Sequence, residues 1–225
     1  MLVTLKEFVV STQEYRGWGW NAMTVSFVAT LFLTIFFQAR GLHDQVRTIW
    51  RNRSGDGVDV LTFVVSAAYF AVLIIYGFSI RSVTVLFNGF VLFPLYLPIL
   101  VGLAKFKGFS ALEWATTAVF LAVVMASAVL PWKGLFFLAV SFVVLAALAL
   151  QPLAMWRTKN AANVSIRFAI GFLVASSFWI VYGLAIRDAL IAGVSIVAAS
   201  LYGLIGLLWI RYRKSAAPKT GDERR

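Results

Sequence analysis

Residues 60–80 have the sequence VLTFVVSAAYFAVLIIYGFSI, a run of 21 residues that contains no charged side chain. An α-helix rises about 1.5 Å per residue, so roughly 20 apolar residues are needed to cross the ~30 Å hydrocarbon core of a bilayer. Lipid offers no partner to backbone amides and carbonyls, and a segment of this kind therefore has to be helical. We predict a transmembrane helix over residues 60–80.

Six further charge-free stretches of 19 to 23 residues surround this one. They are residues 17–39, 82–104, 114–132, 134–156, 168–186 and 189–210. The composition agrees, because 61% of the residues are hydrophobic and 13% are charged, whereas about a quarter are charged in a soluble domain. We therefore predict an all-α membrane protein with seven transmembrane helices.

Lys and Arg are unevenly divided between alternate connections of these segments, 15 in one set and 5 in the other. The rich set comprises 40–59, 105–113, 157–167 and the tail from 211, and the poor set comprises the N-terminus and the turns around 81, 133 and 187. Cytoplasmic loops carry the excess of Lys and Arg. We expect a multi-pass protein of the cell membrane with its N-terminus outside and its C-terminus in the cytoplasm, and no nucleic-acid partner despite the net charge of +11.

An internal duplication emerges when the sequence is compared with itself at an offset of 106 residues. Tyr76-Gly77 then meets Tyr182-Gly183, and Gln45, which precedes a basic run, meets Gln151, which precedes another. A three-span unit ends on the side opposite to its start, so one linking span gives both copies the same orientation. Parallel repeats in secondary transporters hold the substrate between them.

The expected fold is therefore two parallel three-helix bundles joined by a linker helix, in a 3+1+3 arrangement. Its parts are an extracellular N-terminal segment 1–16, a first repeat 17–104, a linker helix 105–133, a second repeat 134–213 and a cytoplasmic basic tail 214–225.

This arrangement resembles the SWEET sugar transporters of the PQ-loop superfamily, over residues 17–213. The residues that carry the resemblance are Gln45, Gln151, Trp179-x-x-Tyr182-Gly183 and Asn88-Gly89. The resemblance implies facilitative transport (uniport) of a small polar solute, a mono- or disaccharide, by alternating access and without a cofactor. It leaves self-association of the chain open.

Two alternatives belong to other classes: a proton-coupled amino-acid or cystine exporter of the PQ-loop type, and a seven-span receptor or scaffold that transports nothing. The seven stretches contain no Asp, Glu, Lys, Arg or His. Proton-coupled carriers place such groups within the membrane, which disfavours the exporter. The sole histidine, His43, lies in a connection, and there is no cysteine. We expect neither enzymatic activity nor a metal site.

Four candidate site residues lie at a similar depth. Trp179 and Leu73 stand 7 positions before Ile186 and Ile80, and Asn88 and Ser195 stand 6 positions after Ser82 and Ala189. At 1.5 Å per residue, these positions are roughly 9–10 Å from the outer boundary.

The resemblance implies substrate-binding roles for all four. Trp179 would stack on a sugar ring and Asn88 would hydrogen-bond hydroxyl groups, with Ser195 and Leu73 completing the pocket. Leu73 replaces the first-copy tryptophan, and the second asparagine is replaced by Ser195, or by Val194 if the repeats align without a gap. The alternative is that Trp179 packs helices and that Asn88 makes an interhelical hydrogen bond.

Gates and hinges are likewise implied by the resemblance. The candidates are Tyr76, Arg81, Tyr182, Arg187 and Asp188 for an external gate, Gln45 and Gln151 for an inner gate, and Pro94, Pro98 and Pro152 for hinges. Proline removes a helical hydrogen bond and permits bending, but a fixed kink would have the same sequence signature. The gate residues could instead anchor the helix ends at the interface.

The orientation can be tested with reporters fused after Arg225. A reporter that is active only in the cytoplasm should be bright, and one that is active only outside should be silent, because the Lys- and Arg-rich connections stay inside. The opposite pattern would overturn the predicted topology.

Overall fold

A computed structural model describes residues 5–55, 58–159 and 166–212. The predicted cytoplasmic tail 214–225 lies outside these residues. The described part contains helices and no strand. They are α1 (Leu5–Val10), α2 (Gln13–Leu33), η1 (Thr34–Ala39, a π-helix), α3 (Arg40–Asn52), α4 (Val60–Ile80), α5 (Val83–Phe106), α6 (Ala111–Val129), α7 (Lys133–Thr158), α8 (Ile166–Ala185) and α9 (Ala189–Tyr212).

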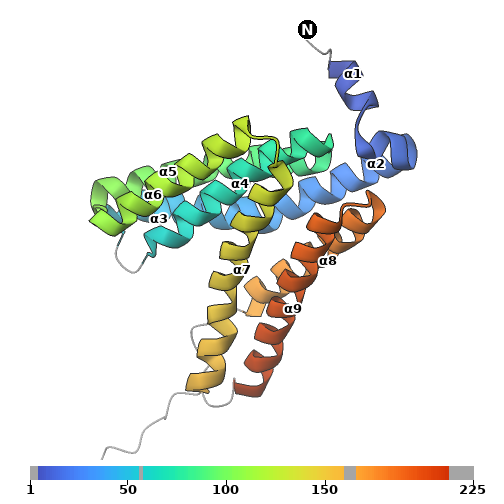
Figure 1. The fold of residues 1–225 in the computed structure, drawn as a ribbon. Coiled ribbons are helices and arrows are strands. Elements are labelled where there is room, and N and C mark those ends of the chain that lie inside the picture. Colours follow the sequence, from blue (N-terminus) through green and yellow to red (C-terminus); the bar gives the residue numbers. More distant parts are fainter. Residues whose placement is uncertain (1–4, 56–57, 160–165, 213–225) are drawn as a thin grey trace, which may run out of the picture.

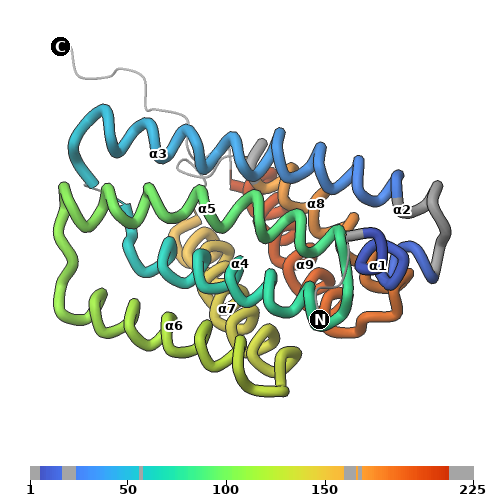
Figure 2. The backbone as a smooth tube through the Cα atoms, turned by 90° about the horizontal axis from the view of Figure 1, so that it is seen from above, coloured from blue at the N-terminus to red at the C-terminus, as the bar shows by residue number. Residues whose placement is uncertain are grey.

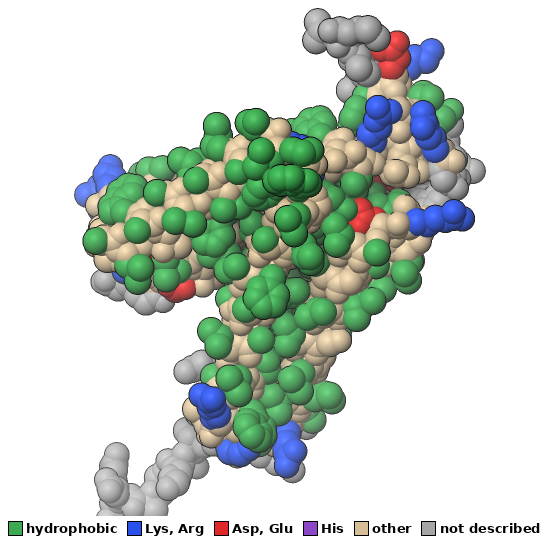
Figure 3. All heavy atoms as spheres, in the orientation of Figure 1, with side chains coloured by type: hydrophobic (Ala, Val, Ile, Leu, Met, Phe, Trp, Pro, Cys, Tyr) green, Lys and Arg blue, Asp and Glu red, His purple; other side chains and the backbone are tan. Residues whose placement is uncertain are grey.

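The all-α membrane class is confirmed. Within the described residues, 6 helices are long and apolar enough to cross a membrane, and α8 adds a shorter apolar stretch, Ala169–Ala185. Each of the predicted segments falls on one of these helices. Lys and Arg side chains gather at the ends of the helical bundles, while the flanks between them are mainly hydrophobic (Figure 3).

The first span is longer at both ends than its charge-free stretch 17–39. α2, η1 and α3 continue one another from Gln13 to Asn52, so the predicted connection 40–59 is largely helical. α3 packs on α5 through the buried Ile49, and the Trp50 indole N–H donates to the Pro98 carbonyl at 3.0 Å. Charge marks where a helix leaves the hydrocarbon, and a helix can continue beyond that point, so the charge-free stretch does not give the bounds of this helix.

The helices form two bundles with the same internal order. In the first, α5 lies between α4 and the continuous helix α2–η1–α3, and in the second, α9 lies between α7 and α8 (Figure 2). The linker α6 lies against α4. The bundles meet through α4 with α7 and, more lightly, α2 with α8, and they diverge toward their other ends (Figure 1). Each contact joins the second helix of one repeat to the first helix of the other.

The two repeats coincide at the offset of 106 residues. α5 begins at Val83 and ends at Phe106, and α9 begins at Ala189 and ends at Tyr212. Residues with a left-handed backbone conformation follow the equivalent helices of the two repeats. They form two equivalent pairs, Arg53 (φ 47°) and Lys159 (φ 52°), and Arg81 (φ 54°) and Arg187 (φ 58°). This register contains no gap, so Leu73 is equivalent to Trp179, and Asn88 is equivalent to Val194 rather than to Ser195.

Polar caps set the starts of the membrane helices. The Asp59 carboxylate accepts hydrogen bonds from the Leu61 and Thr62 amides at 3.3 and 3.0 Å and from the Thr62 hydroxyl. Chiefly the Thr62 hydroxyl holds the pKa of Asp59 below its usual value. Ser82 caps α5 in the same way through the Val85 amide at 3.0 Å. Such caps satisfy amides that have no partner in the first helical turn.

Close packing within the second bundle depends on Gly183. A β-carbon added there would lie 2.6 Å from the Ala192 amide nitrogen, whereas one added at Gly193 would meet nothing within 4 Å. We expect Gly183→Ala to lower the free energy of unfolding by about 1–3 kcal/mol through overpacking. Gly193→Ala is the matched control and should leave stability unchanged or raise it, because alanine favours helices.

Thermal unfolding of the two purified variants in the same detergent measures this difference. Equal melting temperatures would show that α8 and α9 are not in contact at Gly183.

Candidate functional site

One apolar cluster joins the two bundles near the end where they converge. Its buried members come from α4, α5, α7, α8 and α9; they are Val72, Leu73, Tyr76, Val85, Phe137, Val140, Tyr182 and Ile191. Trp179 and Val194 are partly buried and pack against this cluster. The structure therefore brings Leu73 and Trp179 into one region, as their common depth in the sequence indicated.

Trp179 lies among aromatic rings of its own helix. Its ring is 5.5 Å from that of Phe178 and 5.4 Å from that of Tyr182, both edge-to-face. Such pairs stabilise a ring in a defined orientation. Because Trp179 remains partly exposed, it combines a packing role with an accessible surface.

Asn88 lies elsewhere, against the first helix of its own repeat. It is 3% exposed, and its side-chain amide donates to the Thr34 hydroxyl at 2.8 Å and to the Gln38 carbonyl oxygen at 3.0 Å. The interhelical hydrogen bond considered from the sequence is therefore present. Both acceptors belong to η1, and π-helical turns often occur at functional sites. The Asn88 amide is thus oriented toward η1.

Thr34 and Gln38, the partners of Asn88, are not among the candidates predicted from the sequence. They are four residues apart in an otherwise apolar segment, which places them on the same helical face. That spacing was an available signal. Ser195, the fourth candidate, is 8% exposed on α9, where it is equivalent to Gly89.

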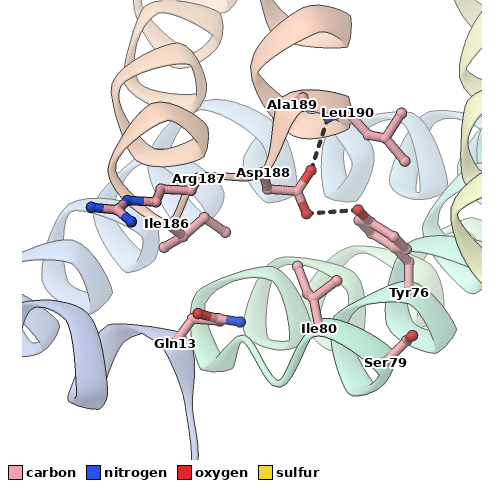
Figure 4. A pocket seen from close by; sticks show the side chains of 9 residues that line it. All are labelled: Gln13, Tyr76, Ser79, Ile80, Ile186, Arg187, Asp188, Ala189 and Leu190. Carbon is pink, nitrogen blue, oxygen red and sulfur yellow. Dashed lines mark hydrogen bonds between the residues drawn. The ribbon is translucent and has the colours of Figure 1, made fainter.

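The converging ends of the repeats are joined by Tyr76 and Asp188. The Tyr76 hydroxyl donates to Asp188 Oδ2 at 2.6 Å, and the Leu190 amide donates to Asp188 Oδ1 at 2.9 Å (Figure 4). The Ile191 amide also donates to Asp188 Oδ1, at 3.0 Å. Asp188 therefore caps α9 while it holds a tyrosine of the other repeat. A hollow of about 460 Å³ adjoins this contact. Its lining also includes Gln13, Ser79, Ile80, Ile186 and Arg187.

Tyr182 makes a second contact of this kind, with Glu14. Its hydroxyl donates to Glu14 Oε1 at 2.6 Å, and the Ser82 hydroxyl donates to the same oxygen at 2.9 Å. The Thr84 amide donates to it at 3.0 Å. Glu14 is 0% exposed. Its place in the predicted extracellular segment 1–16 follows from charge alone, and α2 begins before the charge-free stretch that predicts the span.

The two arginines at this end do not join these contacts. Arg81 and Arg187 are exposed, and their left-handed backbones end α4 and follow α8. The Arg187 side chain points away from Asp188 (Figure 4). Of the five predicted gate residues, Tyr76, Tyr182 and Asp188 are therefore the ones that the structure brings into hydrogen-bonded contacts between the repeats.

The remaining predicted residues lie farther from the converging end than the gate tyrosines do. Gln45 in α3 and Gln151 in α7 are both half-buried, in different bundles (Figure 1). Pro94 and Pro98 lie inside α5, and Pro152 lies buried inside α7. Each repeat thus carries proline in a helix that continues on both sides of it.

Comparison with known proteins agrees with this architecture. Residues 134–217 match a family model described as "Sugar efflux transporter for intercellular exchange". The chain is similar to the solved structure of a eukaryotic SWEET transporter, with a TM-score of 0.65 and 19% sequence identity, over 85% of this chain and 98% of the other. No curated protein matches the sequence.

The structural match supports the 3+1+3 arrangement, since it covers nearly all of a SWEET transporter. The family match falls on the second repeat, which contains Trp179, Tyr182 and Gly183. The resemblance found in the sequence is therefore confirmed: the chain has the SWEET fold, and its second three-helix repeat carries the sequence pattern of the SWEET sugar efflux family.

Proposed function

We propose that this protein is a facilitative transporter that moves a mono- or disaccharide through the membrane by alternating access. The observation that carries the proposal is the arrangement of its repeats. Two equivalent bundles meet at one end and diverge at the other (Figure 1). A rocking motion of two such units about a central site would expose that site to one side at a time.

The orientation inferred from Lys and Arg identifies the state of this conformer. The converging end carries the connections poor in basic residues, so it would face outside, and the diverging end would face the cytoplasm. In the opposite state, bending at Pro94, Pro98 and Pro152 would close the inner end. Gln45 and Gln151 would then approach one another as the inner gate.

Solute binding is assigned to the region between the apolar cluster and η1. Trp179 would stack on a sugar ring, and Leu73 and Ser195 would shape the pocket. Asn88 would act with Thr34 and Gln38, which orient its amide through the two hydrogen bonds described above. Amides and hydroxyls both donate and accept, as a sugar hydroxyl also does.

The binding site is tested by Trp179→Ala and Asn88→Ala in a radiolabelled sugar panel with proteoliposomes. Loss of a partner for a polar solute costs about 1–3 kcal/mol, or roughly 5- to 150-fold in affinity. We expect each change to reduce flux severely at near-normal protein abundance. Trp132→Ala is the control, because Trp132 is 62% exposed in the turn before α7 and should leave flux unchanged.

Leu73→Trp is the companion variant, since it places tryptophan at both equivalent positions. A shift in solute preference is expected if position 73 lines the pocket. Normal flux per molecule in both alanine variants, with unchanged preference in Leu73→Trp, would place the binding site elsewhere.

One observation favours the proton-coupled exporter. Glu14 is a fully buried carboxylic acid on a span helix, and buried ionisable groups in membranes commonly relay protons. Glu14 lies in the contacts of the outer end, away from the Asn88 amide and its partners in η1. We therefore expect solute flux to be indifferent to a protonophore.

The effect of a protonophore on flux is measured by counterflow of sugars and of amino acids in proteoliposomes. Accumulation against a gradient that collapses with a protonophore and disappears in Glu14→Gln would identify the coupled exporter instead. Absence of flux for every solute, with the protein folded, would favour a receptor or scaffold.

A further inference from the structure

The two repeat-equivalent tyrosines make crossed contacts at the outer end. Tyr76 of the first repeat reaches Asp188, the residue that caps the third helix of the second repeat. Tyr182 of the second repeat reaches Ser82, which caps the third helix of the first repeat. Ser82 and Asp188 are themselves equivalent at the offset of 106 residues. The contacts are therefore related by the same pseudo-two-fold relation as the bundles.

The two caps differ in one chemical respect. Asp188 brings a carboxylate, which accepts from Tyr76 and from the Leu190 amide. Ser82 brings only a hydroxyl, and the carboxylate on its side comes from Glu14.

Glu14 accepts hydrogen bonds from the repeat equivalents of two donors to Asp188. Its Oε1 accepts from Tyr182 at 2.6 Å and from the Thr84 amide at 3.0 Å, and Thr84 is the repeat equivalent of Leu190. A residue outside the duplicated pattern thus stands where the second repeat has an aspartate.

We propose that Glu14 is a positioning residue of the external gate, supplying the carboxylate that the first repeat lacks. Two tyrosine–carboxylate pairs, Tyr76 with Asp188 and Tyr182 with Glu14, then hold the outer ends of the repeats together. This inference rests on the proposed alternating access, because opening to the outside must separate both pairs. Hydrogen bonds to a carboxylate are about twice as strong as neutral ones, and burial keeps water from competing for them.

The Glu14 pair is also built to be reversible. Its second oxygen, Oε2, is buried and has no hydrogen-bond partner among the residues that the structure describes. An unpartnered buried carboxylate oxygen disfavours the closed state. Opening would admit water to Oε2 while it breaks the bonds to Oε1. The opposing effects keep the free-energy difference between the two gate states small, as repeated cycling requires.

The test measures access to the path from outside, and it needs no solute. The chain contains no cysteine, so Leu73→Cys introduces a single thiol behind the gate, at a position 5% exposed. A membrane-impermeant thiol reagent is applied from the outer face, and the rate of labelling is measured in this background. We expect Glu14→Gln and Tyr182→Phe each to raise the labelling rate by about 10-fold, because each removes a hydrogen bond to a charged group.

Combined variants identify the pairs. The double variant Glu14→Gln/Tyr182→Phe should raise the labelling rate no further than either single change, because both changes break the same pair. In the double variant Glu14→Gln/Tyr76→Phe the two increases in labelling rate should multiply, because the changes act on separate pairs. Glu7→Gln, which neutralises an exposed carboxylate on α1, is the control and should leave the rate unchanged.

A purely structural role for Glu14 predicts a different result. The melting temperature would then fall in Glu14→Gln while the labelling rate per folded molecule stayed at the control value, and the proposal would be overturned. The proposal would also be overturned if the increases in labelling rate multiplied in the double variant Glu14→Gln/Tyr182→Phe. If Glu14→Gln does not fold, the proposal still requires Tyr182→Phe to match Tyr76→Phe in raising the rate. If these labelling results are obtained but no sugar is transported, the proposed substrate is rejected and the proposed gate is not.

Discussion

Hydrocarbon offers no hydrogen-bond partner to the peptide backbone, and the whole molecule is arranged around that constraint. It requires every spanning segment to be helical and leaves side chains as the means of joining one helix to another. In this protein the polar side chains that do so are few and specifically placed. The amide of Asn88 joins α5 to η1, and the tyrosine hydroxyls of α4 and α8 join the two repeats.

The duplicated architecture explains where these polar contacts occur. Each repeat orders its helices in the same way, with the third helix in the middle, and each brings a tyrosine to the end of its second helix where the bundles converge. The shared register of α5 and α9 places that tyrosine opposite the cap of the other repeat's third helix. The repeats can therefore be joined twice at one end while they remain apart at the other. This asymmetry along the membrane normal is what an alternating-access cycle needs.

The repeats are not chemically equivalent, and the differences fall at the positions to which we assign solute binding and gating. Trp179 corresponds to Leu73, Asn88 to Val194, and Asp188 to Ser82. One member of each pair carries the aromatic or polar group and the other carries a smaller or apolar one. Glu14, which belongs to no repeat position in this register, restores the carboxylate at one of them. The proposed gate thus has a carboxylate for each of its two tyrosines, while Trp179 and Asn88 have no aromatic or amide counterpart in the other repeat.

The sequence by itself determined the class, the spans and the duplication, because these depend on local properties. The charge-free stretch 60–80 and the helix α4 have the same bounds, and Tyr76 and Tyr182 already indicated the register of the repeats. Charge delimited the apolar stretches, but it could not show where a helix ends, so α3 and the start of α2 were missed. Only the tertiary structure decided the partners. Whether Asn88 is oriented toward Trp179 or Thr34, and whether Glu14 meets solvent or Tyr182, depends on how helices distant in sequence pack together, and that packing has no local signature.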